Sequence, residues 1–261
     1  MMEKLIIKNR KDQKIVVVLE KQENQKGLVF VMHGLGGFKE QPHVQTFKEA
    51  FREESFTTIL FDSTNTLGES EGKYEEATTT NYFEDLEDVI EWAKTQDFYE
   101  EPFWLIGHSL GGISVALYAE NFPEKVKGVA PISPVVSGKL SVETERYGDG
   151  EVIKKWKETG WMIRESKSKP GVIKKLKWSH MEDRLKYNLL EKVNKLIMPV
   201  LIIVGEKDEG TPPEHQKILF DAIPTEKKEL HIIKDAPHTF REKVQLEEIK
   251  KLIKNWIEKY T

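Results

Sequence analysis

A serine stands between glycines in the run Gly107-His108-Ser109-Leu110-Gly111, directly after the apolar residues 103–106. The glycines permit a sharp turn from a strand into a helix, which would hold Ser109 in a strained conformation with its hydroxyl exposed. Such a hydroxyl can attack a carbonyl carbon if a base removes its proton. The alternative is a glycine-rich turn in which Ser109 only caps the following helix. The apolar strand before the motif and the helical pattern after it favour a nucleophile.

A base and an acid follow downstream, each after a segment typical of a strand. Asp208 lies in the loop after residues 199–205, and His238 follows residues 229–234. An imidazole can take the proton of a serine, and a carboxylate can orient the imidazole. We therefore predict a catalytic triad of Ser109, Asp208 and His238.

Three nearby acids compete with Asp208. Glu206 is close to the strand end, Glu209 is one residue past the favoured position, and Asp235 precedes a turn at Pro237. We also expect packing or surface roles for five other histidines, which are His43, His108, His180, His215 and His231.

The upstream turn His33-Gly34-Leu35-Gly36-Gly37 follows a buried-type strand at 28–32. Its glycines would let the amide of Leu35 point at the alkoxide that forms when a carbonyl is attacked. The amide of Leu110, at the positive end of a helix dipole, is the second expected donor. These two amides are the predicted oxyanion hole, and His33 is expected to hold the turn by a backbone hydrogen bond.

The elements that must position these residues alternate along the chain. Strands are predicted at 5–8, 14–20, 28–32, 57–62, 103–107, 127–133, 200–205 and 229–234, and helices at 42–53, 79–95, 109–121, 213–222 and 243–260. This α/β alternation predicts a mainly parallel eight-stranded sheet with helices on both faces. The active site is expected at the carboxyl ends of the parallel strands.

Residues 135–195 interrupt the alternation. This stretch is strongly charged, contains no buried-type strand, and has helical fragments separated by glycines and a proline. We predict an inserted helical cap, with residues 1–134 and 196–261 forming the core. Trp156, Trp161 and Trp178 either line an acyl or aromatic pocket or seal the cap onto the core.

Composition excludes several function classes. The chain has 40 Lys and Arg against 44 Asp and Glu, so no basic excess suggests nucleic acid as a partner. It has no cysteine, which excludes thiolate metal sites and is compatible with the cytoplasm. We expect no signal peptide, no stable membrane insertion, and no metal or cofactor, because no metal-binding or phosphate-binding motif is present. A homodimer is left open.

The chain resembles a serine esterase of the α/β-hydrolase superfamily, over nearly its whole length. Its order Ser, Asp, His is that superfamily's order. It resembles most the small prokaryotic cinnamoyl (feruloyl) esterases and carboxylesterases similar to monoacylglycerol lipase. The matching runs are 33–36, 107–112, 205–208 and 237–238.

The resemblance implies the α/β-hydrolase fold and a serine carboxylesterase that hydrolyses small to medium acyl or aromatic esters through an acyl-enzyme. Thioesterase, amidase and peptidase activities use the same triad, so they stay open. A non-catalytic hydrolase-like binding protein is the alternative from a different class. Such proteins usually lose a triad member, and this chain keeps all three.

Overall fold

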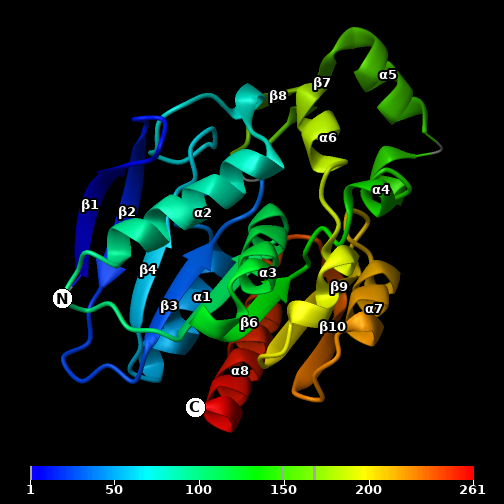
Figure 1. Ribbon diagram of the computed structural model, residues 1–261. Coiled ribbons are helices and arrows are strands. Elements are labelled where there is room, and N and C mark those ends of the chain that lie inside the picture. The colour runs from blue at the N-terminus through cyan, green and yellow to red at the C-terminus, as the bar shows by residue number, and fades with distance from the viewer. Residues whose placement is uncertain (1, 149, 167–168) are drawn as a thin grey trace.

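The computed structural model describes residues 2–148, 150–166 and 169–261. Its central sheet contains, in chain order, β1 (Met2–Lys8), β2 (Lys14–Glu20), β3 (Leu28–Met32), β4 (Thr57–Phe61), β5 (Phe103–His108), β6 (Val126–Ile132), β9 (Val200–Lys207) and β10 (Lys228–Pro237). The spatial order is β1-β2-β4-β3-β5-β6-β9-β10 (Figure 1). β1 and β2 pair antiparallel, as do β2 and β4, and the other neighbours are parallel. The predicted mainly parallel eight-stranded sheet is confirmed.

The helices of the core domain are α1 (Pro42–Glu53), α2 (Thr79–Ala93), α3 (Leu110–Asn121), α7 (Pro213–Ala222) and α8 (Lys243–Tyr260), with short 3₁₀ turns η1 (Tyr74–Glu76) and η2 (Pro123–Lys125). The bounds of α1, α7 and α8 agree with the sequence prediction. A proline in the first turn starts both α1 and α7, where its missing amide proton costs nothing. α2 ends two residues before the predicted end.

The sheet separates two hydrophobic cores. Along each buried strand, successive side chains point alternately into one core and into the other. Phe30 and Met32 of β3 pack on the side of α2 and α3. Val29 and Val31 pack on the other side, with α1 and α8. Helices therefore cover both faces of the sheet, as predicted (Figure 1).

Between β6 and β9 the chain forms an insert with α4 (Gly138–Ser141), η3 (Glu145–Tyr147), α5 (Glu151–Thr159), β7 (Trp161–Glu165), β8 (Ile173–Lys177), α6 (Ser179–Arg184), η4 (Leu189–Glu191) and η5 (Val193–Lys195). β7 and β8 pair as an antiparallel hairpin, so the prediction of a purely helical cap is wrong. The sequence analysis did not find the two strands because only one residue of each is buried. Their alternation therefore lacks the apolar run of a core strand.

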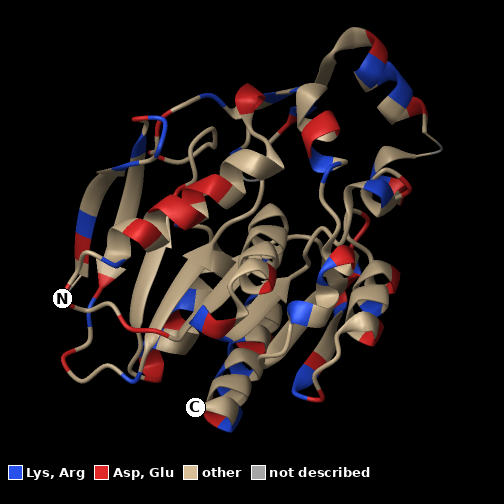
Figure 2. Cartoon of the chain, in the orientation of Figure 1, with Lys and Arg blue, Asp and Glu red and all other residues tan. Residues whose placement is uncertain are grey.

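Charged residues lie on the helices, the loops, the insert and the other strands of the sheet, whereas β3, β4 and β5 contain no Lys, Arg, Asp or Glu (Figure 2). None of the helices in the described ranges has the length and apolar character needed to span a lipid bilayer.

Candidate active site

Ser109 occupies the turn between β5 and α3. Its backbone has φ 56° and ψ −112°, and a positive φ of this kind costs on the order of 1–3 kcal/mol. A β-carbon at Gly107 would lie 2.4 Å from the carbonyl oxygen of Gly111, and one at Gly111 would lie 2.4 Å from that of His33. Positions 107 and 111, two residues before and two residues after Ser109, therefore leave no room for a side chain. Ser109 occupies the N-cap position of α3, but its side chain makes no capping hydrogen bond there, so capping does not explain the serine side chain.

The Ser109 hydroxyl lies against the imidazole of His238. The distance from His238 Nε2 to Ser109 Oγ is 2.8 Å, and that from His238 Nδ1 to Asp208 Oδ2 is 2.7 Å. Because an ionised carboxylate only accepts, Nδ1 carries the ring proton and Nε2 is free to accept the proton of the serine. The structure thus brings together the three predicted side chains from the ends of β5, β9 and β10.

The Asp208 carboxylate is buried and fully hydrogen-bonded. Its Oδ1 accepts from the amides of Gly210 and Thr211, each at 2.9 Å, and its Oδ2 also accepts from the Thr211 hydroxyl at 2.9 Å. Burial alone would raise the pKa of Asp208, but His238 and the hydrogen bonds outweigh it and hold that pKa well below its usual range. Asp208 is therefore ionised throughout the physiological pH range.

Thr211 is a site residue that the sequence analysis missed. Its Oγ1 lies 3.2 Å from His238 Nδ1 and 3.1 Å from the carbonyl oxygen of Ser133, in addition to its bond with Asp208. The signal was present in the spacing, since a threonine three residues after an aspartate can direct both its amide and its hydroxyl to the carboxylate.

The competing acids have other partners. Glu206 accepts a hydrogen bond from the amide of Asp235. Asp235 pairs with Lys207 on the surface. Glu209 is exposed and contributes its carbonyl oxygen to the amide of Arg146. Within the described ranges only Asp208 among these acids bonds to His238.

The turn expected to supply the oxyanion hole lies directly against Ser109. The amide of Gly37 donates to the carbonyl of Gly34 at 2.9 Å, and the amide of Gly36 donates to the hydroxyl of Tyr82 at 3.2 Å. A β-carbon at Gly34 would lie 3.0 Å from Ser109 Cβ. Among the described residues the amides of Leu35 and Leu110 have no hydrogen-bond acceptor, so both remain available as donors.

His33 holds this turn, as predicted. The amide of Ser63 donates to its Nε2 at 3.0 Å, so Nδ1 carries the proton and donates to the carbonyl of Gly34 at 2.8 Å. Burial lowers the pKa of His33, which keeps the ring neutral.

A buried ion pair anchors the far end of the same loop. Asp62 accepts from the amide of Lys39 at 2.8 Å and from its Nζ at 2.7 Å. The Lys39 side chain is 2% exposed and that of Asp62 is fully buried. Burial opposes the charge of Lys39, but its contacts with Asp62, Glu40 and Glu69 raise its pKa above the usual value. Sequence spacing did not reveal this pair, because 22 residues separate its members.

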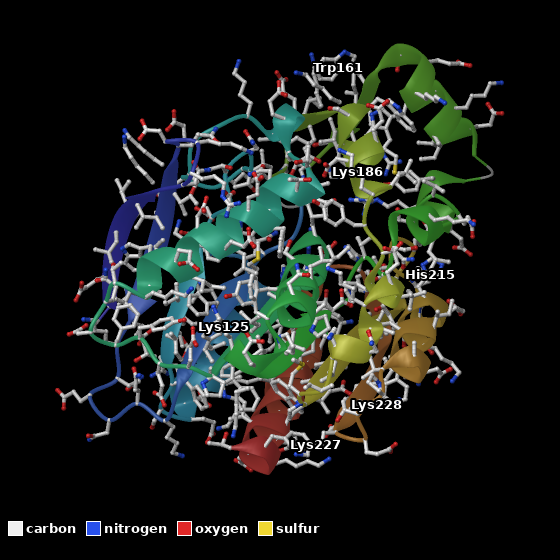
Figure 3. The ribbon with its side chains drawn as sticks, in the orientation of Figure 1. Lys125, Trp161, Lys186, His215, Lys227 and Lys228 are labelled. Carbon is white, nitrogen blue, oxygen red and sulfur yellow. The ribbon has the colours of Figure 1, made fainter. Side chains whose placement is uncertain are left out.

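The three tryptophans of the insert occupy different environments. Trp156 is 1% exposed, donates from Nε1 to the carbonyl of Leu176 at 3.0 Å, and packs edge-on against the half-buried Trp178. Trp161 is 37% exposed at the outer end of the insert (Figure 3). The structure therefore favours a sealing role for Trp156. Trp161 lies on the more exposed face of the hairpin, because alternate strand residues face opposite ways. Substrate contacts of Trp161 and Trp178 stay predictions.

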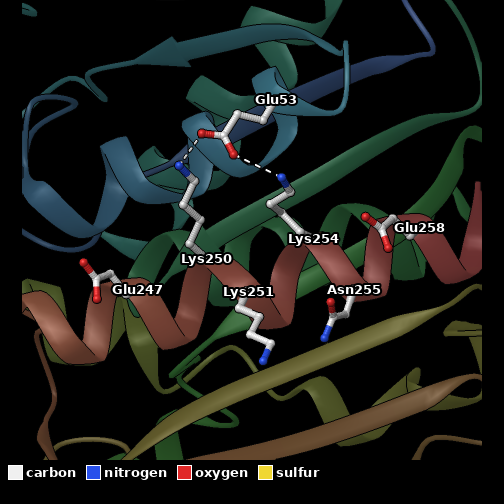
Figure 4. A pocket seen from close by; sticks show the side chains of 7 residues that line it. All are labelled: Glu53, Glu247, Lys250, Lys251, Lys254, Asn255 and Glu258. Carbon is white, nitrogen blue, oxygen red and sulfur yellow. Dashed lines mark hydrogen bonds and ion pairs between the residues drawn. The ribbon is translucent and has the colours of Figure 1, made fainter.

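A surface cavity elsewhere on the molecule is lined by residues of α8 together with Glu53 of α1 (Figure 4). Lys250 and Lys254 both pair with Glu53 there. These ion pairs connect α1 and α8, so the charged residues that line this cavity have a structural role at the contact between the two helices.

Comparisons with known proteins agree with this architecture. Est1E from Butyrivibrio proteoclasticus, solved with ferulic acid bound, has a TM-score of 0.82 over 98% of each chain at 24% identity. This likeness shows that the chain has the α/β-hydrolase fold. The thermostable monoacylglycerol lipase of Bacillus sp. (strain H-257) is 23% identical over 80% of this chain and 82% of its own. A 31.7 kDa uncharacterised Escherichia coli protein of the traX-finO intergenic region is 29% identical over 81% and 82%.

The expected resemblance is thereby confirmed at the level of fold and family. The family described as serine aminopeptidase, S33, matches residues 23–243, which contain six of the eight strands of the central sheet, from β3 to β10 in chain order. With this match over most of its length, the chain belongs to the serine aminopeptidase S33 family, and it has the α/β-hydrolase fold.

Proposed function

We propose that this protein is a serine carboxylesterase that hydrolyses small to medium acyl or aromatic esters. The observation that carries the proposal is the continuous hydrogen-bonded chain from Asp208 through His238 to the hydroxyl of Ser109, with links of 2.7 and 2.8 Å. A neutral imidazole that donates from Nδ1 to Asp208 can accept the hydroxyl proton at Nε2, as nucleophilic attack requires.

In the first half-reaction Ser109 Oγ attacks the ester carbonyl carbon while His238 Nε2 takes the hydroxyl proton. The carbonyl oxygen becomes an oxyanion, which the amides of Leu35 and Leu110 stabilise. His238 then gives its proton to the departing alkoxide, and an alcohol leaves. The acyl group stays as an ester of Ser109.

In the second half-reaction water takes the place of the alcohol. His238 removes a proton from the water as the water oxygen attacks the acyl-enzyme, and the same amides hold the second oxyanion. Collapse releases the carboxylic acid and returns the proton to Ser109. Asp208 stays ionised throughout and stabilises the imidazolium that forms twice in each cycle.

Two observations on related proteins support esters as the substrate class. The Bacillus relative is a monoacylglycerol lipase, and Est1E was solved with ferulic acid, an aromatic acid. The insert above the site supports a limit on substrate size, because a covered site accepts compact substrates better than emulsified fat.

The test is a substrate panel of 4-nitrophenyl butyrate, methyl cinnamate, a monoacylglycerol, an acyl-CoA thioester and an amino-acid 4-nitroanilide. We expect ester turnover by the wild type and a loss of about 10⁴- to 10⁶-fold in kcat for Ser109→Ala. Ser179→Ala, a change at an exposed serine of the insert, is the matched control and should retain full activity. Near-wild-type turnover by a folded Ser109→Ala variant would refute the proposal.

The family description favours peptide-bond hydrolysis as a second candidate. The triad can perform it by the same steps, with an amine as the leaving group. The nitroanilide arm of the panel decides between the two, because an aminopeptidase would cleave it faster than the butyrate ester. If no substrate analogue reacts covalently with the protein and the protein hydrolyses no member of the panel, it is a binding protein instead.

A further inference from the structure

Four cationic side chains of the insert, Arg146, Arg164, Lys174 and Arg184, form what we call the cap cation cluster. The Arg164 guanidinium lies 5.7 Å from the ring centroid of Tyr147, and Arg184 Nη1 lies 3.5 Å from its hydroxyl. Arg164 Nη2 also donates to the carbonyl of Arg146 at 3.2 Å. Lys174 Nζ stands 5.2 Å from the ring centroid of Tyr74.

No carboxylate among the described residues lies within 4.0 Å of any member of this cluster. Other cations of the same insert do have acidic partners. Lys177, on the same strand as Lys174, pairs with Glu76, and Lys186 pairs with Asp183. Exposed lysines of the insert, such as Lys155 and Lys175, also have no acidic partner in the part of the chain that the structure describes, but water can solvate them. Arg164, Lys174 and Arg184 are partly or fully buried, so they lack both a carboxylate and full solvation.

Gathering these charges without a counter-ion is unfavourable. Arg164 of β7 and Lys174 of β8 stand directly opposite each other in the hairpin, and like charges in this arrangement destabilise a sheet. Arg184 is 6% exposed, its Nη2 bonds to the neutral His180, and its Nε has no partner among the described residues. Burial, followed by the fields of Arg146 and Arg241, lowers the pKa of Lys174 to about 8. An anion bound among these groups would relieve each of these costs.

The cluster reaches both sides of the candidate active site. A β-carbon at Gly36, in the turn beside Ser109, would lie 2.9 Å from Lys174 Nζ. A β-carbon at Gly210, whose amide binds Asp208, would lie 3.1 Å from Arg146 Nη1. Lys174 thus lies beside the turn expected to supply the oxyanion hole, and Arg146 lies beside the loop that holds Asp208.

We propose that the substrate is an anionic ester, whose carboxylate or phosphate group is bound by the cap cation cluster while its ester carbonyl lies at Ser109. The inference rests on the proposed esterase function and adds its substrate class. Ammonium and guanidinium groups make charge-assisted hydrogen bonds to such anions, and a guanidinium can bind a carboxylate or phosphate with two parallel bonds.

Two matched ester pairs test the proposal and locate the anion. 4-Nitrophenyl butyrate against mono-4-nitrophenyl succinate places a carboxylate on the acyl side, and 1-butyrylglycerol against its 3-phosphate places a phosphate on the alcohol side. We expect kcat/KM to be at least about tenfold higher for the anionic member of one pair. Raising the salt to about 0.5 M should shrink this advantage, because salt screens charge attraction.

Variants connect the preference to the cluster. Lys174→Met and Arg164→Met should each lower the ratio of kcat/KM between the anionic and the neutral ester by about 10- to 100-fold. Lys175→Met is the matched control, because Lys175 is exposed on the opposite face of β8, and its ratio should equal that of the wild type. Lys174→Glu places a carboxylate beside Arg164, its partner in the hairpin, and should remove the preference for the anionic ester.

A binding measurement separates this proposal from the proposed function. Calorimetry on the Ser109→Ala protein should show mono-4-nitrophenyl succinate binding without turnover, with a weaker Kd when Lys174→Met is added. Equal kcat/KM for anionic and neutral esters in both pairs would overturn the proposal of an anionic substrate, but the proposed esterase function would stand. A loss that is the same for both members of a pair and follows a fall in Tm would also overturn it, since the cations would then only stabilise the insert.

Discussion

His108 Nε2 donates a hydrogen bond of 2.7 Å to the backbone carbonyl of His238. His108 is the residue before the proposed nucleophile, so the elbow that holds Ser109 also holds the segment that carries the base. Burial lowers the pKa of His108 to about 3, which keeps the ring neutral and its donor proton in place near neutral pH. His108 therefore has a positioning role for His238 in addition to the packing role expected from the sequence.

Removing this link should disturb catalysis more than binding. His108→Phe keeps the ring volume but loses the donor, and we expect kcat to fall roughly tenfold with little change in KM, because a small displacement of His238 lengthens its bond to Ser109. His108→Gln can still donate and should recover most of the rate. Steady-state kinetics of the two variants on one ester checks this, and equal losses in both would contradict it.

The identity of the acid is tested by removing its charge. Asp208→Asn should lower kcat by about 10⁴-fold, because the amide can donate to His238 Nδ1 and so favours the wrong tautomer. Glu209→Gln and Asp235→Asn are matched controls, since neither side chain bonds to His238. A severe loss in the Asp235 variant and a mild one in the Asp208 variant would reverse the assignment.

Thr211 should contribute through its hydroxyl. Thr211→Val removes the hydrogen bond to Asp208 Oδ2 and the contact with His238 Nδ1, and we expect a fall in kcat of about 3- to 30-fold. Thr211→Ser preserves the hydroxyl and should stay close to the wild-type rate. If Val and Ser variants are equally active, the amide of residue 211 alone suffices to hold the carboxylate.

Glu120, at the end of α3 away from Ser109, should make stability depend on pH. The residue is 3% exposed, one of its carboxyl oxygens has no partner among the described residues, and burial raises its pKa from 4.5 to about 8. The folded protein therefore keeps a proton that the unfolded chain has released between these two pH values. The contribution of Glu120 to the free energy of unfolding must fall as pH rises through this window.

Glu120→Gln removes this titration. Its free energy of unfolding should match the wild type near pH 4 and exceed it by about 2–4 kcal/mol at alkaline pH. Denaturant unfolding at several pH values measures the difference, with the exposed Glu124→Gln as control. A difference that stays constant with pH would show that Glu120 does not titrate in this range.

The sequence predicted the sheet, the core helices and the three triad residues because each has a local signature. Buried strands such as β3 are continuous apolar runs. Ser109 stands between glycines, and the tight turn leaves no room for a side chain at either glycine position. The amphipathic hairpin of β7 and β8 lacks such a run. The roles of His108 and Lys39 depend on contacts with His238 and Asp62, which only the folded chain brings within reach.

The most direct test of the account is the site of covalent labelling by a small fluorophosphonate, followed by digestion and mass spectrometry of the peptides. Its phosphorus reacts only with a serine whose proton a neighbouring base can remove. We expect a single adduct on the peptide that contains Ser109, complete loss of esterase activity on labelling, no adduct in Ser109→Ala, and much slower labelling in His238→Ala. An adduct on another residue, or esterase activity that survives full labelling of Ser109, would contradict the account.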